Sequence, residues 1–337
     1  LSGVDLCSAP PMRWMVRGVL PLERLAALYG PSGAGKSFLT LDIAAAIAGG
    51  ADEWFGRRVT QRKVTYVCLE GEQGMGKRIK AWSLRHEKPT PSGLRFITQP
   101  FDLLDGDDVA ELAKAVQATG GAGGLVILDT LNRAAPGADE NSSVDMGRII
   151  AAAKRLQAIA GGLVLLVHHV GKDASKGLRG HSSLYAALDG AIEVSKVDSR
   201  REWSVAKSKD DEAGTVHPFR LQVVTVGTDD DGEDITSCVV VQDAAVQDVK
   251  RVKLPSGGNQ FLAMKALAEP LRTSSQFNKA GAPPGRPCLE LECAIRLVAE
   301  SLACEPKRRN ERAREAITGL INRGVYGLKD GWLWRAD

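Results

Sequence analysis

The sequence predicts an α/β fold with a mostly parallel sheet, an antiparallel extension at one edge of that sheet, and a small C-terminal unit. A glycine-rich loop lies between an apolar, strand-like run and a helix rich in Ala and Leu. Further continuous apolar runs follow, as expected of parallel strands that are buried on both faces. These runs end in carboxylates or histidines. From residue 191 the runs become shorter and alternate, which is typical of antiparallel strands.

The composition of the 337 residues is that of a globular protein, with 44% apolar and 25% charged residues, and the length favours two domains. A net charge of +3 excludes nucleic-acid binding through bulk charge, so any such surface must come from local clusters. No apolar run reaches the length of a membrane span, and six scattered cysteines match no zinc spacing. We therefore expect a cytoplasmic protein with free thiols and no membrane partner.

We expect four segments along the chain. Residues 1–24 contain several prolines and glycines and predict an extended strap. An α/β domain follows over 25–246, and a basic segment with Pro and Gly over 247–259 is interpreted as a linker. The remaining residues, 260–337, form the C-terminal unit.

The glycine-rich loop spans residues 30–37 and has the pattern GxxxxGK[ST]. It follows the apolar run 25–29 and precedes a helix over 38–48, which is the setting in which backbone N–H groups and a helix N-terminus bind phosphate. Lys36 is expected to contact the β- and γ-phosphates of ATP, and Ser37 to ligate Mg²⁺. The other residues that we expect to line the nucleotide are Gly30, Pro31, Ser32, Gly33, Ala34, Gly35 and Phe38.

Two later strand-like runs deliver carboxylates to the same edge of the sheet. The run 63–69 ends at Glu70, and the run 125–128 ends at Asp129. Because ligands of open α/β sheets bind at the carboxyl ends of the strands, Glu70 is a candidate to orient the attacking water, and Asp129 to hold Mg²⁺. The alternatives are an acidic loop, which we prefer for Glu72, and a turn-capping role for Asp129.

A third buried run, 163–167, ends at His168 and His169. Either histidine could contact phosphate or water, and a structural role is almost as well supported. The following basic loop, 172–183, suits contact with a phosphate backbone through Lys176 and Arg179, and the alternative is an exposed surface loop.

The segment after residue 191 predicts an antiparallel extension, with a hairpin turn at 229–232. Lys207 and Lys209 stand two residues apart in it, so they point to the same side if this segment is a strand.

The C-terminal unit shows helical spacing over 261–271, 289–302 and 307–323, followed by a hairpin through 329–331. This pattern outlines a winged helix. Basic residues at the start of the third helix oppose the helix dipole, so a phosphate partner is one explanation and plain solvent exposure is the other. These residues are Lys307, Arg308, Arg309 and Arg312.

The order of these motifs over residues 10–241 resembles the RecA-like ATPases of the hexameric helicase class, especially the plasmid RepA and phage helicase types and, more distantly, DnaB. The resemblance rests on RGVLP, GPSGAGKS, VCLEGE, LVILDT, LVHH, KGLRGHSS, LDGAIEV and AKSKDDEAG in that order. It implies an ATP-hydrolysing motor on single-stranded DNA that works in replication as a homo-hexameric ring, with an initiator or primase as possible partners.

The same resemblance implies roles for individual residues. It makes Glu70 the catalytic glutamate, and it puts His168 and His169 at a position that senses phosphate. Lys207 and Lys209 fall on a KxR pair that reaches the γ-phosphate of a neighbouring subunit, with Lys209 in place of the arginine. Lysine keeps the positive charge but lacks the planar guanidinium that can form two parallel hydrogen bonds. Arg179 is therefore a second candidate for the residue that reaches the γ-phosphate of the neighbouring subunit.

Two other functions compete with the helicase. A DNA-dependent ATPase that does not unwind, such as a recombination mediator or a filament-forming protein, has the same motifs. A small-molecule kinase is disfavoured, because the chain has a winged-helix-like tail and lacks an arginine-rich lid insert.

Overall fold

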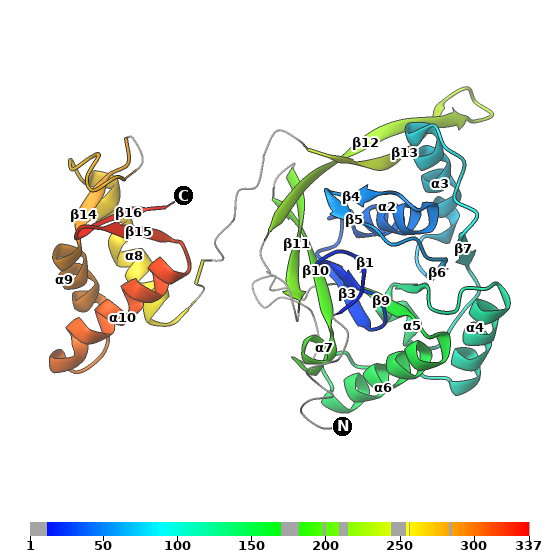
Figure 1. The fold of residues 1–337 in the computed structure, drawn as a ribbon, viewed down its shortest axis with the longest axis horizontal. Helices are drawn as coiled ribbons and strands as arrows, with labels where there is room; N and C mark the ends of the chain where they lie inside the picture. Colours follow the sequence, from blue (N-terminus) through cyan, green and yellow to red (C-terminus); the bar gives the residue numbers. More distant parts are fainter. Residues whose placement is uncertain are drawn as a thin grey trace. The chain divides into compact units, whose positions relative to one another are not determined.

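The computed structural model describes residues 12–169, 182–197, 200–208, 215–243, 254–255, 257–282 and 285–336. The chain divides into two compact units, Leu1–Lys250 and Arg251–Asp337 (Figure 1). Each unit has its own hydrophobic core and is described by itself.

A nine-stranded sheet forms the centre of the N-terminal unit, in the order β13-β12-β11-β10-β3-β9-β8-β6-β7. The strands from β10 to β7 are parallel to one another, and β11, β12 and β13 continue the sheet in antiparallel pairs. Their bounds are β3 Leu25–Gly30, β6 Val64–Cys68, β7 Leu94–Ile97, β8 Leu125–Asp129, β9 Leu163–His169, β10 Gly190–Val197, β11 Arg200–Ser208, β12 Val216–Thr228 and β13 Asp234–Gln242. The predicted parallel sheet with an antiparallel edge is therefore confirmed.

Helices cover both faces of this sheet (Figure 1). One apolar layer joins α2, Lys36–Gly49, to side chains such as Ala26 and Leu28, and α3, Glu72–His86, packs against its margin. The opposite layer joins α4, Gly106–Ala118, α6, Ser143–Ala160, and α7, Ser182–Ala187, to the alternate side chains of the same strands. Continuous apolar runs in β3, β8 and β9 follow from this two-sided burial.

Shorter elements complete the unit. Two strands, β1 Trp14–Val16 and β2 Leu20–Pro21, pair within the segment expected to be a strap, and Met15, Val16 and Leu20 are fully buried in the α2 layer. A second small pair consists of β4, Glu53–Trp54, and β5, Arg57–Arg58. The one-turn helix α5, Leu131–Ala134, follows β8 directly.

The C-terminal unit has the order helix, strand, helix, helix, strand, strand. Its elements are α8 Gly258–Thr273, β14 Cys288–Glu290, α9 Leu291–Ser301, the 3₁₀ turn η2 Pro306–Arg308, α10 Arg309–Asn322, β15 Tyr326–Lys329 and β16 Trp332–Arg335. The strands form a sheet in the order β14-β16-β15. Asp330 and Gly331 both have positive φ, which suits the tight turn between β15 and β16.

Two details of this unit differ from the sequence expectation. Leu289 belongs to a strand and not to the second helix, because it pairs with Leu333 of β16. Lys307 and Arg308 lie in the 3₁₀ turn that opens with Pro306, so the third helix begins only at Arg309. Proline suits the first position of such a turn, because its missing N–H would have no partner there in any case.

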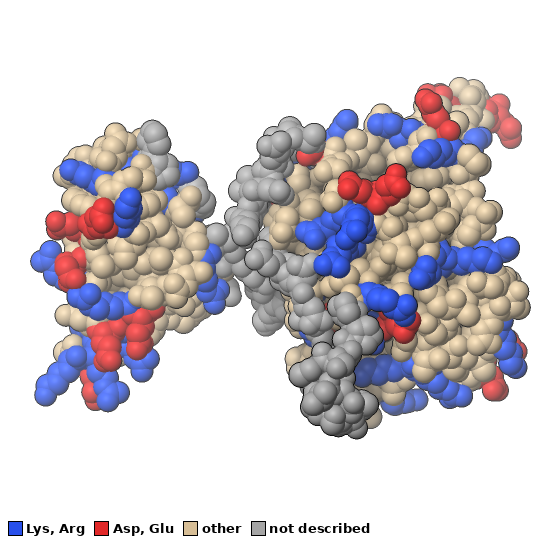
Figure 2. All heavy atoms as spheres, in the orientation of Figure 1, with Lys and Arg blue, Asp and Glu red and all other residues tan. Residues whose placement is uncertain are grey.

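No helix within the described ranges is long and apolar enough to cross a membrane. Cys68, Cys238, Cys288, Cys293 and Cys304 are free thiols. Basic and acidic side chains are interspersed over the face of the molecule in Figure 2.

Because each unit has its own core, we expect the two units to unfold independently. Leu320 is fully buried in the C-terminal core, so Leu320→Ala should lower the free energy of unfolding of that unit by about 2–5 kcal/mol. The matched variant Leu328→Ala, at a side chain that is 38% exposed, should cost less than about 0.5 kcal/mol. Hydrogen exchange resolved by peptide measures each unit in the full chain, and equal losses of protection in both units would contradict independent cores.

Candidate nucleotide site

The glycine-rich loop lies where β3 ends and α2 begins, at the carboxyl edge of the parallel strands. Gly33 and Gly35 adopt positive φ values of 73° and 97°, which side chains with a Cβ rarely adopt. Gly35 is the N-cap of α2 and supplies no side-chain cap, so the first N–H groups of the helix stay available to an anion. A Cβ on Gly30 would lie 2.1 Å from the carbonyl oxygen of Val194, so β10 fixes the start of the loop closely.

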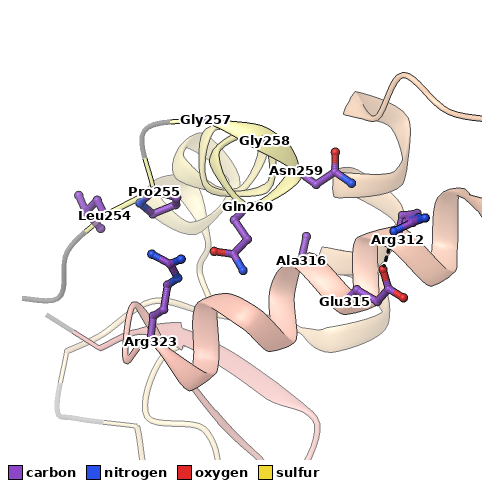
Figure 3. Close-up of a pocket in the computed structure, with 10 residues that line it drawn as sticks. All are labelled: Leu254, Pro255, Gly257, Gly258, Asn259, Gln260, Arg312, Glu315, Ala316 and Arg323. Carbon is purple, nitrogen blue, oxygen red and sulfur yellow. Dashed lines mark hydrogen bonds and ion pairs between the residues drawn. The ribbon is translucent and has the colours of Figure 1, made fainter. Parts of the chain in front are cut away.

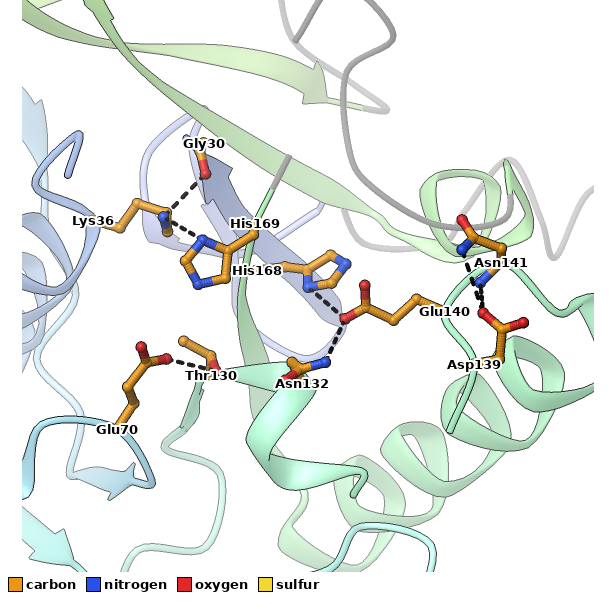
Figure 4. Close-up of polar contacts among 10 residues, drawn as sticks. All are labelled: Gly30, Lys36, Glu70, Thr130, Asn132, Asp139, Glu140, Asn141, His168 and His169. Carbon is orange, nitrogen blue, oxygen red and sulfur yellow. Dashed lines mark hydrogen bonds and ion pairs between the residues drawn. The ribbon is translucent and has the colours of Figure 1, made fainter. Parts of the chain in front are cut away.

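Lys36 carries the positive charge of this loop and is only 6% exposed. Its ammonium donates to the carbonyl oxygens of Gly30 and Pro31, both at 3.0 Å, and lies 3.2 Å from Nδ1 of His169 (Figure 4). Burial lowers the pKa of Lys36, while the nearby carboxylates of Asp129 and Glu70 oppose that shift. The cation is held against the loop's carbonyl groups, where phosphate oxygens would be far stronger partners.

Asp129 ends β8 and is fully buried. The Tyr66 hydroxyl of β6 donates to its Oδ2, whereas Oδ1 is buried and has no hydrogen-bond partner among the described residues. Burial raises the pKa of Asp129, and the hydrogen bond from Tyr66 together with the nearby Ser37 hydroxyl opposes this effect. A buried carboxylate oxygen without a partner, close to the Ser37 hydroxyl, fits the oxygen ligands that Mg²⁺ prefers.

The described residues hold no cluster of three or more His, Cys, Asp or Glu side chains that could bind a metal by themselves. Mg²⁺ usually takes one or two protein ligands and completes its shell with water and substrate phosphates.

Glu70 lies two residues beyond the end of β6, at the solvent side of the same edge. Its Oε2 accepts a hydrogen bond of 3.1 Å from the hydroxyl of Thr130, which follows Asp129. Figure 4 shows its carboxylate on the side of the site that faces Lys36 and His169. Glu72 is exposed in the first turn of α3, as expected for a solvated residue.

The two histidines at the end of β9 point in different directions, because successive strand residues face opposite sides. His169 contacts Lys36, and burial together with the Lys36 charge lowers the pKa of His169. His168 is fully buried and faces Glu140 instead, with Nδ1 3.9 Å from Oε1 (Figure 4). Asn132 also donates to that oxygen. Of the two candidate histidines, the structure thus brings His169 to the phosphate loop and places His168 in a buried polar contact with Glu140.

Sequence reasoning missed two residues at this site. Tyr66 lies four positions before Glu70 and points to the Asp129 side of β6, and alternation along the strand could have indicated it. Arg78 lies on α3, and the sequence alone suggests that its side chain is exposed to solvent. Its guanidinium instead lies 4.9 Å from the centre of the Phe38 ring, and its Nη1 is buried without a partner among the described residues. Its charge also opposes the raised pKa of Asp129.

Other predicted residues lie elsewhere. Lys207 of β11 donates to the carbonyl oxygens of Tyr185 and Ala186, at 2.7 and 3.1 Å. Lys209, Lys176 and Arg179 fall outside the described residues.

The basic residues of the C-terminal unit have mixed surroundings. Lys307 and Arg308 are exposed, whereas Arg309 donates to the carbonyl oxygen of Cys304. Arg312 donates to Glu315 at 3.2 Å, beside a hollow of about 670 Å³ between the start of α8 and α10 (Figure 3). The volume of this hollow is within the usual range of ligand pockets, but none of the phosphate-site residues lines it.

Residues 2–175, about half of the chain, match the family model described as an AAA domain. The chain belongs to this AAA domain family. The matched segment contains the phosphate loop, both carboxylates and the histidine pair, and the mostly parallel sheet around them fits a RecA-like P-loop core. Among solved structures, the crystal structure of the RadB recombinase is similar at 17% identity, with a TM-score of 0.43, covering 66% of this chain and 94% of that one. No curated protein matches the sequence.

The geometry predicts different effects of Lys36 and Asp129 on the affinity for ATP. Lys36→Ala should weaken ATP binding by about 10- to 150-fold, which corresponds to about 1.5–3 kcal/mol for a charge-assisted contact. Asp129→Asn should leave the affinity for ATP without Mg²⁺ nearly unchanged, and it should abolish the increase in affinity that Mg²⁺ causes. Titration of a fluorescent ATP analogue with and without Mg²⁺ measures both effects. If Mg²⁺ increases the ATP affinity of the Asp129→Asn protein as much as that of the parent, Asp129 does not bind the metal.

Proposed function

We propose that the N-terminal unit hydrolyses ATP and drives a single-stranded-DNA motor of the plasmid and phage replicative helicase type. The observation that carries the hydrolytic part is the convergence of Lys36, Asp129 and Glu70 at the carboxyl ends of β3, β8 and β6. Phosphoryl transfer depends on positioning and on stabilising charge, and these three residues provide a cation, a metal ligand and a base.

In this proposal each residue acts on a different part of ATP. The loop N–H groups and Lys36 hold the β- and γ-phosphates, and the ammonium moves from the carbonyl groups of Gly30 and Pro31 to phosphate oxygens. Ser37 and Asp129 would hold Mg²⁺, and the ion would supply positive charge next to the phosphates. Glu70, oriented by Thr130, aligns the attacking water and accepts its proton.

His169 is the residue placed to detect the γ-phosphate. It shares the Lys36 ammonium, so the movement of that ammonium onto a phosphate would free His169 Nδ1 for a new partner. We assign the sensing role of the histidine pair to His169, and a supporting role, through Glu140 and Asn132, to His168.

The ring and the DNA contacts are the less direct parts of the proposal. Glu70 is exposed at the sheet edge, which leaves room for a neighbouring subunit to complete the site. The C-terminal unit has the helix and strand order of a winged helix, and its exposed Lys307 and Arg308 suit contact with a DNA backbone. A homo-hexamer with Lys209 or Arg179 as the trans-acting cation follows from the family resemblance.

One observation favours the second candidate, a DNA-dependent ATPase that does not unwind DNA. Lys207 is bound to two backbone carbonyl groups of its own subunit and stacks over Tyr185 at 5.1 Å, so it is not presented as a projecting finger. Weaker coupling between neighbouring sites would suit a protein that binds DNA without translocating along it.

Strand displacement separates the two candidates. The parent protein should separate a forked duplex in the presence of ATP, and the Glu70→Gln protein should not, because the same site supplies the energy. ATP hydrolysis that DNA stimulates, with no strand displacement on any fork, would favour the second candidate.

Glu70→Gln should keep ATP binding and lose about 10²- to 10⁴-fold in turnover, because the amide cannot accept the proton from water. Glu72→Gln is the matched control, since that side chain is exposed in α3, and it should hydrolyse ATP at close to the parent rate. Steady-state ATPase with saturating Mg²⁺ and ATP measures both. Near-normal turnover in Glu70→Gln would remove Glu70 from the mechanism and promote Glu72.

DNA binding by the C-terminal unit predicts a change in salt dependence. Replacing both Lys307 and Arg308 by Ala should reduce the slope of log K against log salt by about 1.4, because each phosphate that a cation neutralises on a single strand adds about 0.7 to that slope. Arg314→Ala is the control, because that arginine is already paired with Glu292 at 2.7 Å. Binding to a labelled oligonucleotide at several salt concentrations gives the slopes. Identical slopes in all the proteins would place the DNA-binding surface elsewhere.

A further inference from the structure

A second pocket of the N-terminal unit, about 490 Å³ in volume, lies beside the C-terminal half of α2. Its walls come from α2, α3, the β4 segment and β13, and residues of the phosphate loop do not contribute to it. Four aromatic rings line it, those of Trp54, Phe55, Trp82 and His86, and a carboxylate, Asp42, lies among them. An acidic group within an aromatic pocket is unusual enough to require a physical explanation.

Asp42 is nearly buried, with 12% of its side chain exposed. The Trp54 indole donates to Oδ2 at 2.8 Å, whereas Oδ1 lies 4.0 Å from His86 Nε2, too far for a hydrogen bond. Burial raises the pKa of Asp42 to about 6, and the indole groups of Trp54 and Trp82 limit that rise. The carboxylate is therefore mostly ionised at neutral pH.

The only ion-pair partner of Asp42 in the described residues is His86, and Lys88 lies at the exposed mouth of the same pocket. Burial and the neighbouring charges of Arg85 and Lys88 lower the pKa of His86, so its imidazole is neutral at pH 7. No Lys or Arg within the described ranges forms an ion pair with Asp42. A desolvated, uncompensated negative charge is costly, and a bound cation would remove that cost.

The walls of the pocket also favour a cation. Trp82 stacks on His86 with 4.6 Å between ring centroids, and Trp54 stacks on Trp203 at 4.7 Å, so the rings are held in fixed orientations. The faces of aromatic rings carry negative potential and attract ammonium and guanidinium groups.

The mouth of the pocket opens to solvent. His86, Lys88 and Pro89 line it and are exposed, so a side chain that projects from a larger partner can enter. A side chain carried by a larger partner would gain further contacts around this rim. Arginine fits better than lysine, because its planar guanidinium can stack on a ring while it donates to a carboxylate.

We propose that this pocket binds an arginine side chain of a partner protein, with the guanidinium on Asp42 and its stem between the aromatic rings. The interaction is separate from ATP hydrolysis, because Asp42 and the rings take no part in the phosphate site. It gives the AAA domain a docking point on the flank of the helix that carries the phosphate loop at its N-terminus.

The test uses the full chain and N-acetyl-arginine amide as the probe, with binding followed by tryptophan fluorescence and calorimetry. A single side chain should bind saturably with a Kd of about 1 mM, which corresponds to about 4 kcal/mol. Asp42→Asn should weaken this binding at least about tenfold, the effect of removing one charge-assisted hydrogen bond. ATPase activity of the Asp42→Asn protein should equal that of the parent and shows that the variant is folded.

A second comparison needs no variant. N-acetyl-citrulline amide has nearly the same shape as the arginine probe but no charge, so it should bind at least about tenfold more weakly to the parent protein. Equal binding of the two probes, no saturable binding of the arginine probe, or an unchanged Kd in Asp42→Asn would each overturn the proposal. Tighter binding of guanosine than of the arginine probe would identify a base pocket instead and also overturn it. Self-association that depends on Asp42 would overturn the assignment to a different protein, because the occupant would then be a second copy of this chain.

Discussion

The structure depends on one electrostatic constraint: a buried lysine and a buried aspartate are held at the carboxyl edge of the same parallel sheet. Lys36 and Asp129 are 6% and 0% exposed, and each has a pKa shifted by burial toward its neutral form. Neither forms an ion pair with the other; Lys36 binds carbonyl groups, and Asp129 accepts from Tyr66. Such charges are poorly compensated until phosphate and a metal arrive, so the fold itself favours Mg²⁺ and a nucleotide.

The rest of the N-terminal unit keeps these two groups in position. Two-sided helix packing allows the uninterrupted apolar strands β3, β8 and β9 that carry the loop, the aspartate and the histidine pair to a common edge. The neighbouring parallel strand contributes as well, since Val194 of β10 lies directly against Gly30. The loop is therefore fixed from both of its sides, and ligand binding can move the Lys36 ammonium without rebuilding the backbone.

Much of this could be predicted from the sequence, because it depends on local patterns. The glycine loop, the strand ends at Glu70 and Asp129, and the switch to antiparallel strands all follow from spacing and composition. The division of labour between His168 and His169 could not be predicted, because it depends on which face of β9 meets the loop. Arg78 and Asp42 were also missed, since a charge on an amphipathic helix looks solvated until neighbouring aromatic rings are known to cover it. Long-range packing decides such cases.

The most direct test of the central claim is the thermal stability of the parent protein with a non-hydrolysable ATP analogue, with and without Mg²⁺. If Lys36 and Asp129 are compensated only by phosphate and metal together, the analogue with Mg²⁺ should stabilise the N-terminal unit by about 2.7 kcal/mol at a concentration one hundred times its Kd. The analogue alone should stabilise it less, and Mg²⁺ alone should have little effect. An equal rise in Tm with and without Mg²⁺, or no rise at all, would contradict the account.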